Sequence, residues 1–310
     1  MLSSMTGALE LGLLYALMAL GVYITYRILD FPDLTVDGSF TTGAGVAAIL
    51  ITNGTSPWLA SLAAFGAGLA AGAITGLLHT KGKINGLLSG ILMMIALYSI
   101  NLRIMGKPNV SLINVDNVFT SIDPLPLMTI VVVLITLLLV LFFHTDLGLA
   151  VRATGDNSRM IRSFGANTDH TTILGVSLSN GLVALSGAMV AQQSGFADIS
   201  MGIGMIVIGL ASVIIGEAIL GSRNILIAAV AAVVGSIVYR LVVAFALRAE
   251  WLHLKTSDLK LITALIVIVA LVLPTARRSW KVRGTARRRT AELGASAAQS
   301  ANSIQTGGKS

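Results

Sequence analysis

Long apolar stretches separated by short polar ones run through most of this 310-residue chain. A hydrocarbon layer about 30 Å thick needs roughly 20 helical residues to cross it, so each stretch predicts a membrane span. The predicted spans are residues 5–26, 40–52, 58–79, 84–101, 125–143, 172–192, 202–220, 225–247 and 259–273. The pattern therefore predicts an all-α integral membrane protein with about eight to ten transmembrane helices.

The span at 40–52 is too short to cross as a straight helix, so part of any crossing there must be extended. Residues 31–38 precede it, and a similar segment, residues 196–202, precedes another glycine-rich span. In the predicted topology these two segments face opposite sides. They indicate an inverted repeat with short broken or re-entrant helices, which is typical of a transport pathway. Chance similarity between apolar segments is the alternative.

Composition and charge agree with a membrane protein. Hydrophobic residues make up 55% of the chain and charged residues 11%, and there is no cysteine, which excludes disulfides and thiolate chemistry. No basic residue precedes Arg27, so the apolar start lacks the basic region of a cleaved signal peptide. The net charge of +7 lies in the C-terminal end: from Thr275 onward there are eight basic residues and one acidic residue.

This charge distribution predicts two parts: a transmembrane domain at 1–275, and a basic, disordered cytoplasmic tail at 276–310 that lies near anionic lipid. No nucleic-acid partner is expected. If the N-terminus is outside, basic residues collect on one side, as the positive-inside rule requires, and the C-terminus is cytoplasmic. These residues are Arg27, Lys81, Lys83, Arg152, Arg159, Arg162 and Arg223. Arg103, Lys107, Arg248 and Lys255 are exceptions on the opposite side.

A polar segment at 146–165 interrupts the long apolar spans. It mixes small, apolar and basic residues in an amphipathic pattern, which predicts a helix that docks a soluble partner, within a coupling loop at 145–170. Asp156 or Asn157 can cap a helix that runs from Met160 to Phe164, and Gly148 and Gly155 permit tight turns and close approach. An ordinary cytoplasmic loop is the alternative.

Several of these segments together resemble a known family, the permease subunits of ATP-binding-cassette (ABC) importers of the branched-chain amino acid and simple-sugar class. The resemblance covers roughly residues 5–275 and rests on 11–22, 31–38, 43–45, 149–157 with Gly165, and 213–218. The run 152–157 is the most specific, because family members carry a similar Arg-Ala-x-Gly-x-Asn run in the cytoplasmic loop that contacts the ATPase. Segments 33–38 and 84–94 are most similar to a subgroup proposed to import tryptophan or tyrosine.

The resemblance implies that the chain is not an enzyme and holds no cofactor, since ATP and Mg bind to separate ATPase subunits. The implied partners are those ATPases, an external substrate-binding protein, a second permease subunit and membrane lipid. The pair of permease subunits is expected to be a homodimer, with a heterodimer as the alternative. The implied location is the inner (cytoplasmic) membrane. The residues that couple to the ATPase would be Arg152, Ala153, Thr154, Gly155, Asp156, Asn157, Met160 and Gly165.

Polar groups at bilayer depth are costly unless paired or hydrated, so they are candidates for a translocation pathway. The candidates, with one adaptable methionine, are Asp33, Thr35, Asn85, Met93, Asn101, Asp198 and Glu217. Glu10 and Arg240 are further ionisable residues in or beside spans. For each of these residues, structural hydrogen bonding or core packing is the alternative role.

Enzyme chemistry is not supported by the sequence. The four histidines lie at span ends or in loops without metal-binding spacing, and no serine has a histidine at comparable depth. Residues 307–310 resemble the end of a phosphate-binding loop but lack its first glycine. The remaining alternative to an importer subunit is an ion-coupled secondary transporter or channel.

Overall fold

A computed structural model describes residues 2–113, 115–120, 122–248, 264–265 and 268. The predicted span at 259–273 lies almost wholly outside these residues, and the tail at 276–310 lies entirely outside them. The elements described here all fall within one compact unit, Met1–Val267.

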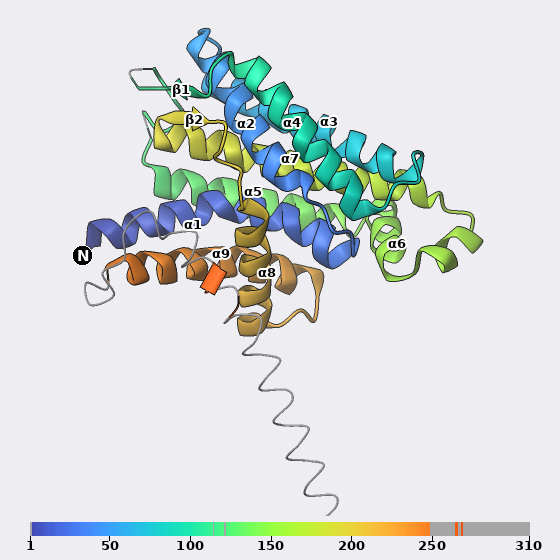
Figure 1. Cartoon of the computed structure of the whole chain (residues 1–310). Coiled ribbons are helices and arrows are strands. Elements are labelled where there is room, and N and C mark those ends of the chain that lie inside the picture. The colour runs from blue at the N-terminus through green and yellow to red at the C-terminus, as the bar shows by residue number, and fades with distance from the viewer. Residues whose placement is uncertain (1, 114, 121, 249–263, 266–267, 269–310) are drawn as a thin grey trace, which may run out of the picture. The chain divides into compact units, whose positions relative to one another are not determined.

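Nine α-helices and one two-stranded antiparallel sheet form the described part of the chain (Figure 1). In chain order the elements are α1 (Leu2–Tyr23), its π-helical extension η1 (Ile24–Ile28), α2 (Thr35–Thr52), α3 (Pro57–Thr80), α4 (Gly86–Met105), β1 (Asn109–Ser111), α5 (Pro124–Phe142), α6 (Asp146–Ser163), α7 (Thr168–Ser194), β2 (Phe196–Asp198), α8 (Met205–Leu220) and α9 (Ile225–Arg248). In the sheet, Val110 pairs with Ala197.

Six of the described helices are long and apolar enough to cross a membrane: Met5–Ile28, Pro57–Thr80, Gly86–Met105, Pro124–Phe142, Thr168–Ser194 and Ile225–Ala246. The shorter helices α2 and α8 pack among them. The prediction of an all-α, multi-pass membrane protein is therefore confirmed. One boundary was wrong, because α2 begins at Thr35 and not at residue 40, so the non-helical stretch before it is shorter than the apolar pattern indicated.

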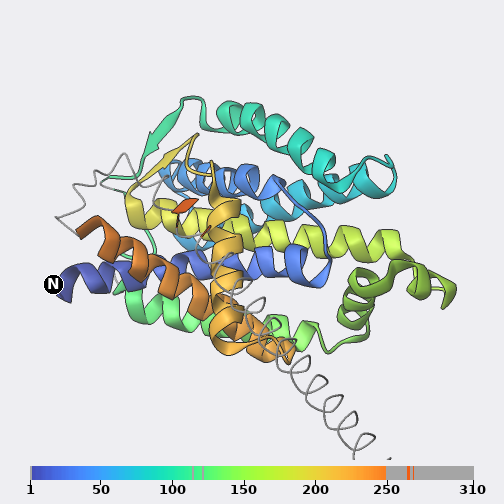
Figure 2. The same cartoon turned by 60° about the horizontal axis from the view of Figure 1, so that its bottom comes forward.

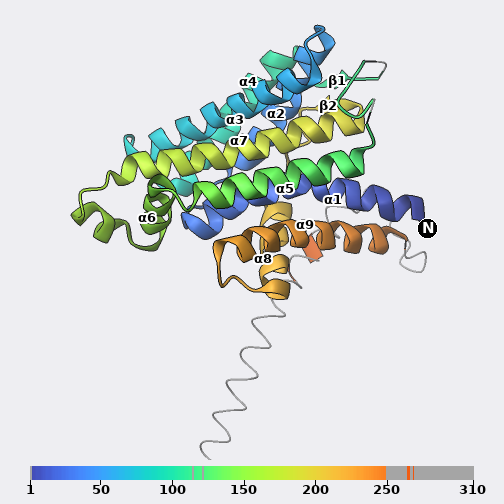
Figure 3. The same ribbon diagram turned by 180° about the vertical axis from the view of Figure 1, so that it is seen from behind.

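The two short helices occupy related positions in the chain. α1 and α7 run in opposite directions, and each is followed by an irregular segment and then by a short helix (Figures 1 and 3). α8 crosses the long helices steeply (Figure 2). Broken helices that follow two oppositely directed long helices are the arrangement that an inverted repeat predicts.

α1 and α7 form the centre of the bundle. In their most apolar 18-residue stretches 78% and 72% is buried, compared with 22% in α5. α1 supplies fully buried Leu14, Leu17 and Met18 to the main core cluster. On α5, in contrast, Leu134, Leu137 and Leu138 are exposed. Such an outward apolar face suits contact with lipid, because exposed leucine side chains are favourable against hydrocarbon and unfavourable against water.

Glycine allows the closest helix contact in this core. A side-chain carbon at Gly43 of α2 would overlap the Ala184 carbonyl of α7, and one at Gly187 of α7 would overlap the Phe40 carbonyl of α2. The two backbones therefore touch reciprocally. Small residues at such crossings are the usual basis of tight packing between membrane helices.

We expect Gly43→Val to lower stability by about 3 kcal/mol or more, because α2 and α7 must separate to admit the side chain. Thermal unfolding of the purified protein in detergent measures the effect. Gly66→Ala is the matched control, since nothing lies within 4 Å of a Cβ at Gly66. Equal melting temperatures for the two variants would contradict the close contact.

Candidate functional site

The two short helices meet through one carboxylate. Asp37, in the first turn of α2, accepts the backbone N–H groups of Gly204 and Ile206 at 2.8 Å each. Thr41, one turn later, accepts the N–H of Gly202 at 3.0 Å. These donors belong to the start of α8, where a helix leaves its first N–H groups unpaired and where negative charge is favoured. α2 therefore supplies the cap that α8 lacks locally.

Sequence reasoning did not single out Asp37, although it lies within the segment 31–38. The feature that could have indicated such a partner is the start of α8, because its N-cap residue is Gly204, which has no side chain with which to cap. A helix start without a local cap requires a partner from elsewhere.

A second polar cluster joins α2, α3 and α7. The Asp33 carboxylate, only 2% exposed, accepts the Thr35 N–H at 2.9 Å and the Asn180 side-chain amide at 2.6 Å. Asn180 in turn accepts the Ser39 hydroxyl at 2.7 Å, and the Thr35 hydroxyl lies 2.9 Å from that of Thr75. Two of the predicted pathway residues, Asp33 and Thr35, thus belong to one buried hydrogen-bond network.

Two more of the predicted pathway residues are also buried. Asn101 of α4 accepts the Thr42 hydroxyl at 2.8 Å and donates to the Gly38 carbonyl at 3.2 Å, which joins α4 to α2. Met93 packs with Ala71 and Leu97 in a small apolar cluster. Both positions are consistent with a structural role in the bundle.

The other three predicted pathway residues lie at the ends of the bundle. Asn85 is exposed and caps α4, accepting the Leu87 N–H at 2.9 Å. Asp198 lies in β2, where hydrogen bonds donated by Ser200 and Asn109 lower the pKa of its carboxyl. Glu217 lies near the end of α8, with its Oε1 atom 2.9 Å from the Arg27 Nε atom. The structure therefore does not bring the seven residues together into one site.

The predicted docking segment is α6, which is bent. Asn157 has non-helical torsion angles (φ −155°, ψ 88°), and its side chain accepts the Met160 N–H at 3.0 Å. The predicted capping role of Asn157 is confirmed. Gly165, with φ +87°, follows the helix in the left-handed conformation that favours glycine.

The first half of α6 is seated on the bundle by a buried face. Val151 is fully buried, and the Thr154 hydroxyl lies 2.8 Å from that of Thr171 in α7. A side-chain carbon at Gly148 would overlap the Phe142 carbonyl, and one at Gly155 the Ile28 carbonyl. Gly148 and Gly155 therefore provide the predicted close approach, but the predicted tight turns were wrong because both residues lie inside the helix.

The second half of α6 projects from the bundle. Met160 is 54% exposed and Phe164 is 76% exposed, and Arg159 is also exposed. Arg162 is held in place, since its guanidinium donates to the Thr168 hydroxyl at 2.6 Å and lies 3.9 Å from Asp169. Large apolar side chains exposed beside arginines are typical of a surface that binds another protein.

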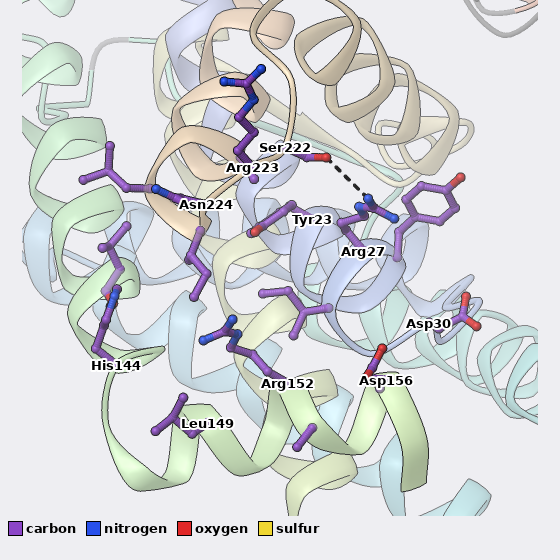
Figure 4. Close-up of a pocket in the computed structure, with 18 residues that line it drawn as sticks. Tyr23, Arg27, Asp30, His144, Leu149, Arg152, Asp156, Ser222, Arg223 and Asn224 are labelled. Atoms are coloured by element: carbon purple, nitrogen blue, oxygen red, sulfur yellow. Dashed lines mark hydrogen bonds between the residues drawn. The ribbon is translucent and has the colours of Figure 1, made fainter. Parts of the chain in front are cut away.

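A cavity of about 970 Å³ opens beside α6 (Figure 4). Its lining includes Arg152, Ala153, Gly155 and Asp156 of α6, and it continues over the end of α1, His144 and the turn between α8 and α9. Arg27 donates across it to Ser222 at 3.4 Å. Four of the eight predicted coupling residues therefore line one cavity, while Thr154, Asn157, Met160 and Gly165 do not.

The bundle combines long apolar helices, two paired broken helices and the α6 helix, which is packed against one end. This combination is typical of a multi-pass membrane transport subunit. The family described as the permease component of branched-chain amino acid transport systems matches residues 4–273, and the chain belongs to this family. It is thus the permease component of an ABC transporter, which confirms the predicted family resemblance and the prediction of a transport subunit in place of an enzyme.

Two relatives are similar in sequence. The tyrosine transport system permease protein of Clostridioides difficile (strain R20291) is 47% identical over 271 residues, which cover 87% of this chain and 91% of that protein. The uncharacterized protein RP368 of Rickettsia prowazekii (strain Madrid E) is 38% identical over 185 residues, 58% of this chain and 64% of that one. A solved structure assigned to a metal-chelate type ABC transporter, in an inward-facing conformation, has 17% identity and a TM-score of 0.49, covering 89% of this chain and 85% of that one.

We expect Asp37→Ala to lower the melting temperature measurably, because the start of α8 loses its cap, and lost caps cost about 0.5–2 kcal/mol. Thermal unfolding in detergent tests this expectation. Asp123→Ala is the matched control, since Asp123 precedes α5 without any side-chain capping bond. If Asp37→Ala melts no earlier than Asp123→Ala, the α2–α8 link does not stabilise the fold.

Proposed function

We propose that this permease is the membrane subunit of an ATP-driven importer that moves an amino acid, with an aromatic one favoured. The amino acid is suggested by the family, and its aromatic character by the 47% identity to a protein named as a tyrosine transport permease. In this proposal an external binding protein delivers the substrate, and separate ATPase subunits bind ATP and Mg. The observation that carries the ATP-driven part is the projecting half of α6.

α6 has the two properties that a coupling element needs. Its first half is fixed, because Val151, Thr154 and Gly155 contact the bundle closely. Its second half presents Met160 and Phe164 beyond the bundle, where an ATPase can enclose them. Movement of the enclosing subunit is then passed on as a rigid-body displacement. The coupling residues proposed are Arg152, Ala153, Thr154, Gly155, Asp156, Asn157, Met160 and Gly165.

The proposed orientation follows from charge. The end of the bundle that carries α6 has Arg27, Lys81 and Lys83 as well as the arginines of α6, and the positive-inside rule makes this end cytoplasmic. The N-terminus and the β1–β2 sheet then lie outside, where the binding protein docks, and the tail at 276–310 is cytoplasmic. The proposed membrane is the inner membrane, and two copies of the chain pair as a homodimer with permease domains at 1–275.

The alternative of an ion-coupled carrier or channel is less well supported. Such a protein needs no external docking helix, and the chain belongs to a family of ABC permeases. The buried acids also have structural partners: Asp33 is bonded to Thr35 and Asn180, and Asp37 to the start of α8.

We expect the wild-type protein, purified in mild detergent from its host, to retain an ABC ATPase. The double variant Met160→Asp with Phe164→Asp should lose that ATPase at least about tenfold, because charge replaces the apolar contact surface. Quantitative mass spectrometry of the copurified proteins is the measurement. Asn53→Asp is the control, since it adds charge at the exposed loop after α2, at the opposite end of the bundle.

Vesicle uptake separates the two functional classes. ATP-dependent uptake by the reconstituted complex supports the importer. Uptake that an ion gradient drives without ATP or an ATPase would contradict it.

A further inference from the structure

One cation lies deep in the bundle. Among the described membrane-crossing helices, Arg27 and Arg103 lie one and two residues before the ends of their spans, whereas Arg240 lies six residues before Ala246. The Arg240 Nε atom is buried without a hydrogen-bond partner in the described part of the chain. An intramembrane arginine is costly unless it is paired, so a position like this one points to function.

The guanidinium is held by an aromatic ring. Its Cζ atom lies 3.9 Å from the centroid of the Tyr15 ring, within the range of a cation–π interaction. Tyr15 lies 13 residues after Leu2 and 13 residues before Ile28, at the midpoint of the continuous α1–η1 helix. The charged group therefore reaches the middle of the bundle.

The direction of the side chain agrees with this depth. Helical side chains tilt toward the N-terminus of their helix. α9 begins at the α6 end of the bundle and runs antiparallel to α1 (Figures 1 and 3). Arg240 is nearer to the C-terminal end of α9, so a tilt toward the N-terminus directs its side chain toward the middle of the helix. This is the opposite of an arginine that extends toward the nearer membrane surface.

The same place is where the broken helices meet. The Tyr15 ring stacks on Phe40 of α2 with centroids 6.0 Å apart and planes 5° apart. Phe40 lies one turn after Asp37, which holds the start of α8. Substrate sites of transporters with broken helices lie near such junctions at mid-membrane depth.

The acids of this region are already engaged. Asp37 accepts two N–H groups of α8, and Glu10 of α1 accepts the Gln193 side-chain amide at 3.3 Å. Neither forms an ion pair with Arg240 among the described residues. Arg240 is only partly buried, so part of its side chain remains accessible.

A carboxylate is the ligand that this geometry suits. A guanidinium binds a carboxylate through two parallel hydrogen bonds, and stacking on an aromatic ring fixes the plane in which they form. We propose that Arg240, held on the Tyr15–Phe40 stack, binds the α-carboxylate of the amino acid as it passes through the permease. This inference rests on the proposed import function.

The first test uses the permease alone in lipid nanodiscs, with L-tyrosine and tyramine as probes. Tyramine has the same ring and amine but no carboxylate. Saturation-transfer NMR should show L-tyrosine binding at least about tenfold more tightly than tyramine, because only the former pairs with the guanidinium. Equal binding of both probes to the unmodified protein would overturn the proposal, and this comparison does not depend on any variant folding.

The second test is uptake of L-tyrosine by the permease reconstituted with its ATPase and binding protein. Arg240→Met should reduce uptake at least about tenfold while ATP hydrolysis persists, and Arg240→Lys should fall in between because it keeps the charge but not the paired hydrogen bonds. Arg103→Met is the matched control, since Arg103 is exposed on α4.

The two proposals fail in different ways. Absence of ATP-dependent uptake of any amino acid by the wild-type complex counts against the import function. If the wild-type complex takes up L-tyrosine normally and folded Arg240→Met does so at the same rate, the role of Arg240 is overturned while the import function stands.

Discussion

The contact between Asp37 and the start of α8 is the constraint on which the interior of the bundle depends. In a membrane, a helix that begins at mid-depth exposes N–H groups that lipid cannot satisfy, so a partner must be supplied by the protein. Here the partner is a carboxylate on the other broken helix, and its negative charge also suits the positive end of α8. This interaction thus satisfies the start of α8 and links the two broken helices to each other.

Around this contact, polar groups are used sparingly and nearly all have partners. Asp33, Asn180 and Asn101 tie α2 to its neighbours, and the touching backbones at Gly43 and Gly187 bring α2 against α7. Among the described residues, Arg240 stands apart, because its Nε atom has no hydrogen-bond partner and its guanidinium lies over the Tyr15 ring. This is the group that we propose binds the carboxylate of a passing amino acid.

The sequence predicted the helical class, the amphipathic segment at 146–165 and the paired interruptions because these depend on local pattern: apolar length, amphipathic spacing and a cap at Asn157. It did not predict Asp37 as the link to α8, or Arg240 over Tyr15, because both contacts join residues more than 160 positions apart. Asn85 and Asp198, named as pathway candidates, lie at the ends of the bundle, since hydropathy does not show which polar side chain turns inward. Gly155 was expected both in a tight turn and at a close approach, and the structure shows only the close approach.

The seat of α6 has a mechanical consequence. Gly155 touches the backbone at Ile28, immediately before the irregular segment that leads through Asp33 into α2. Because no side chain lies between the two backbones, no flexible side chain can absorb a displacement at this point. In the proposed importer, a movement of the projecting end of α6 would reach the break between α1 and α2 through this contact, and the same break is tied through Asp33 to Asn180 in the middle of α7. In the proposed importer, this glycine contact would be one route by which movement of the ATPase reaches the middle of the bundle.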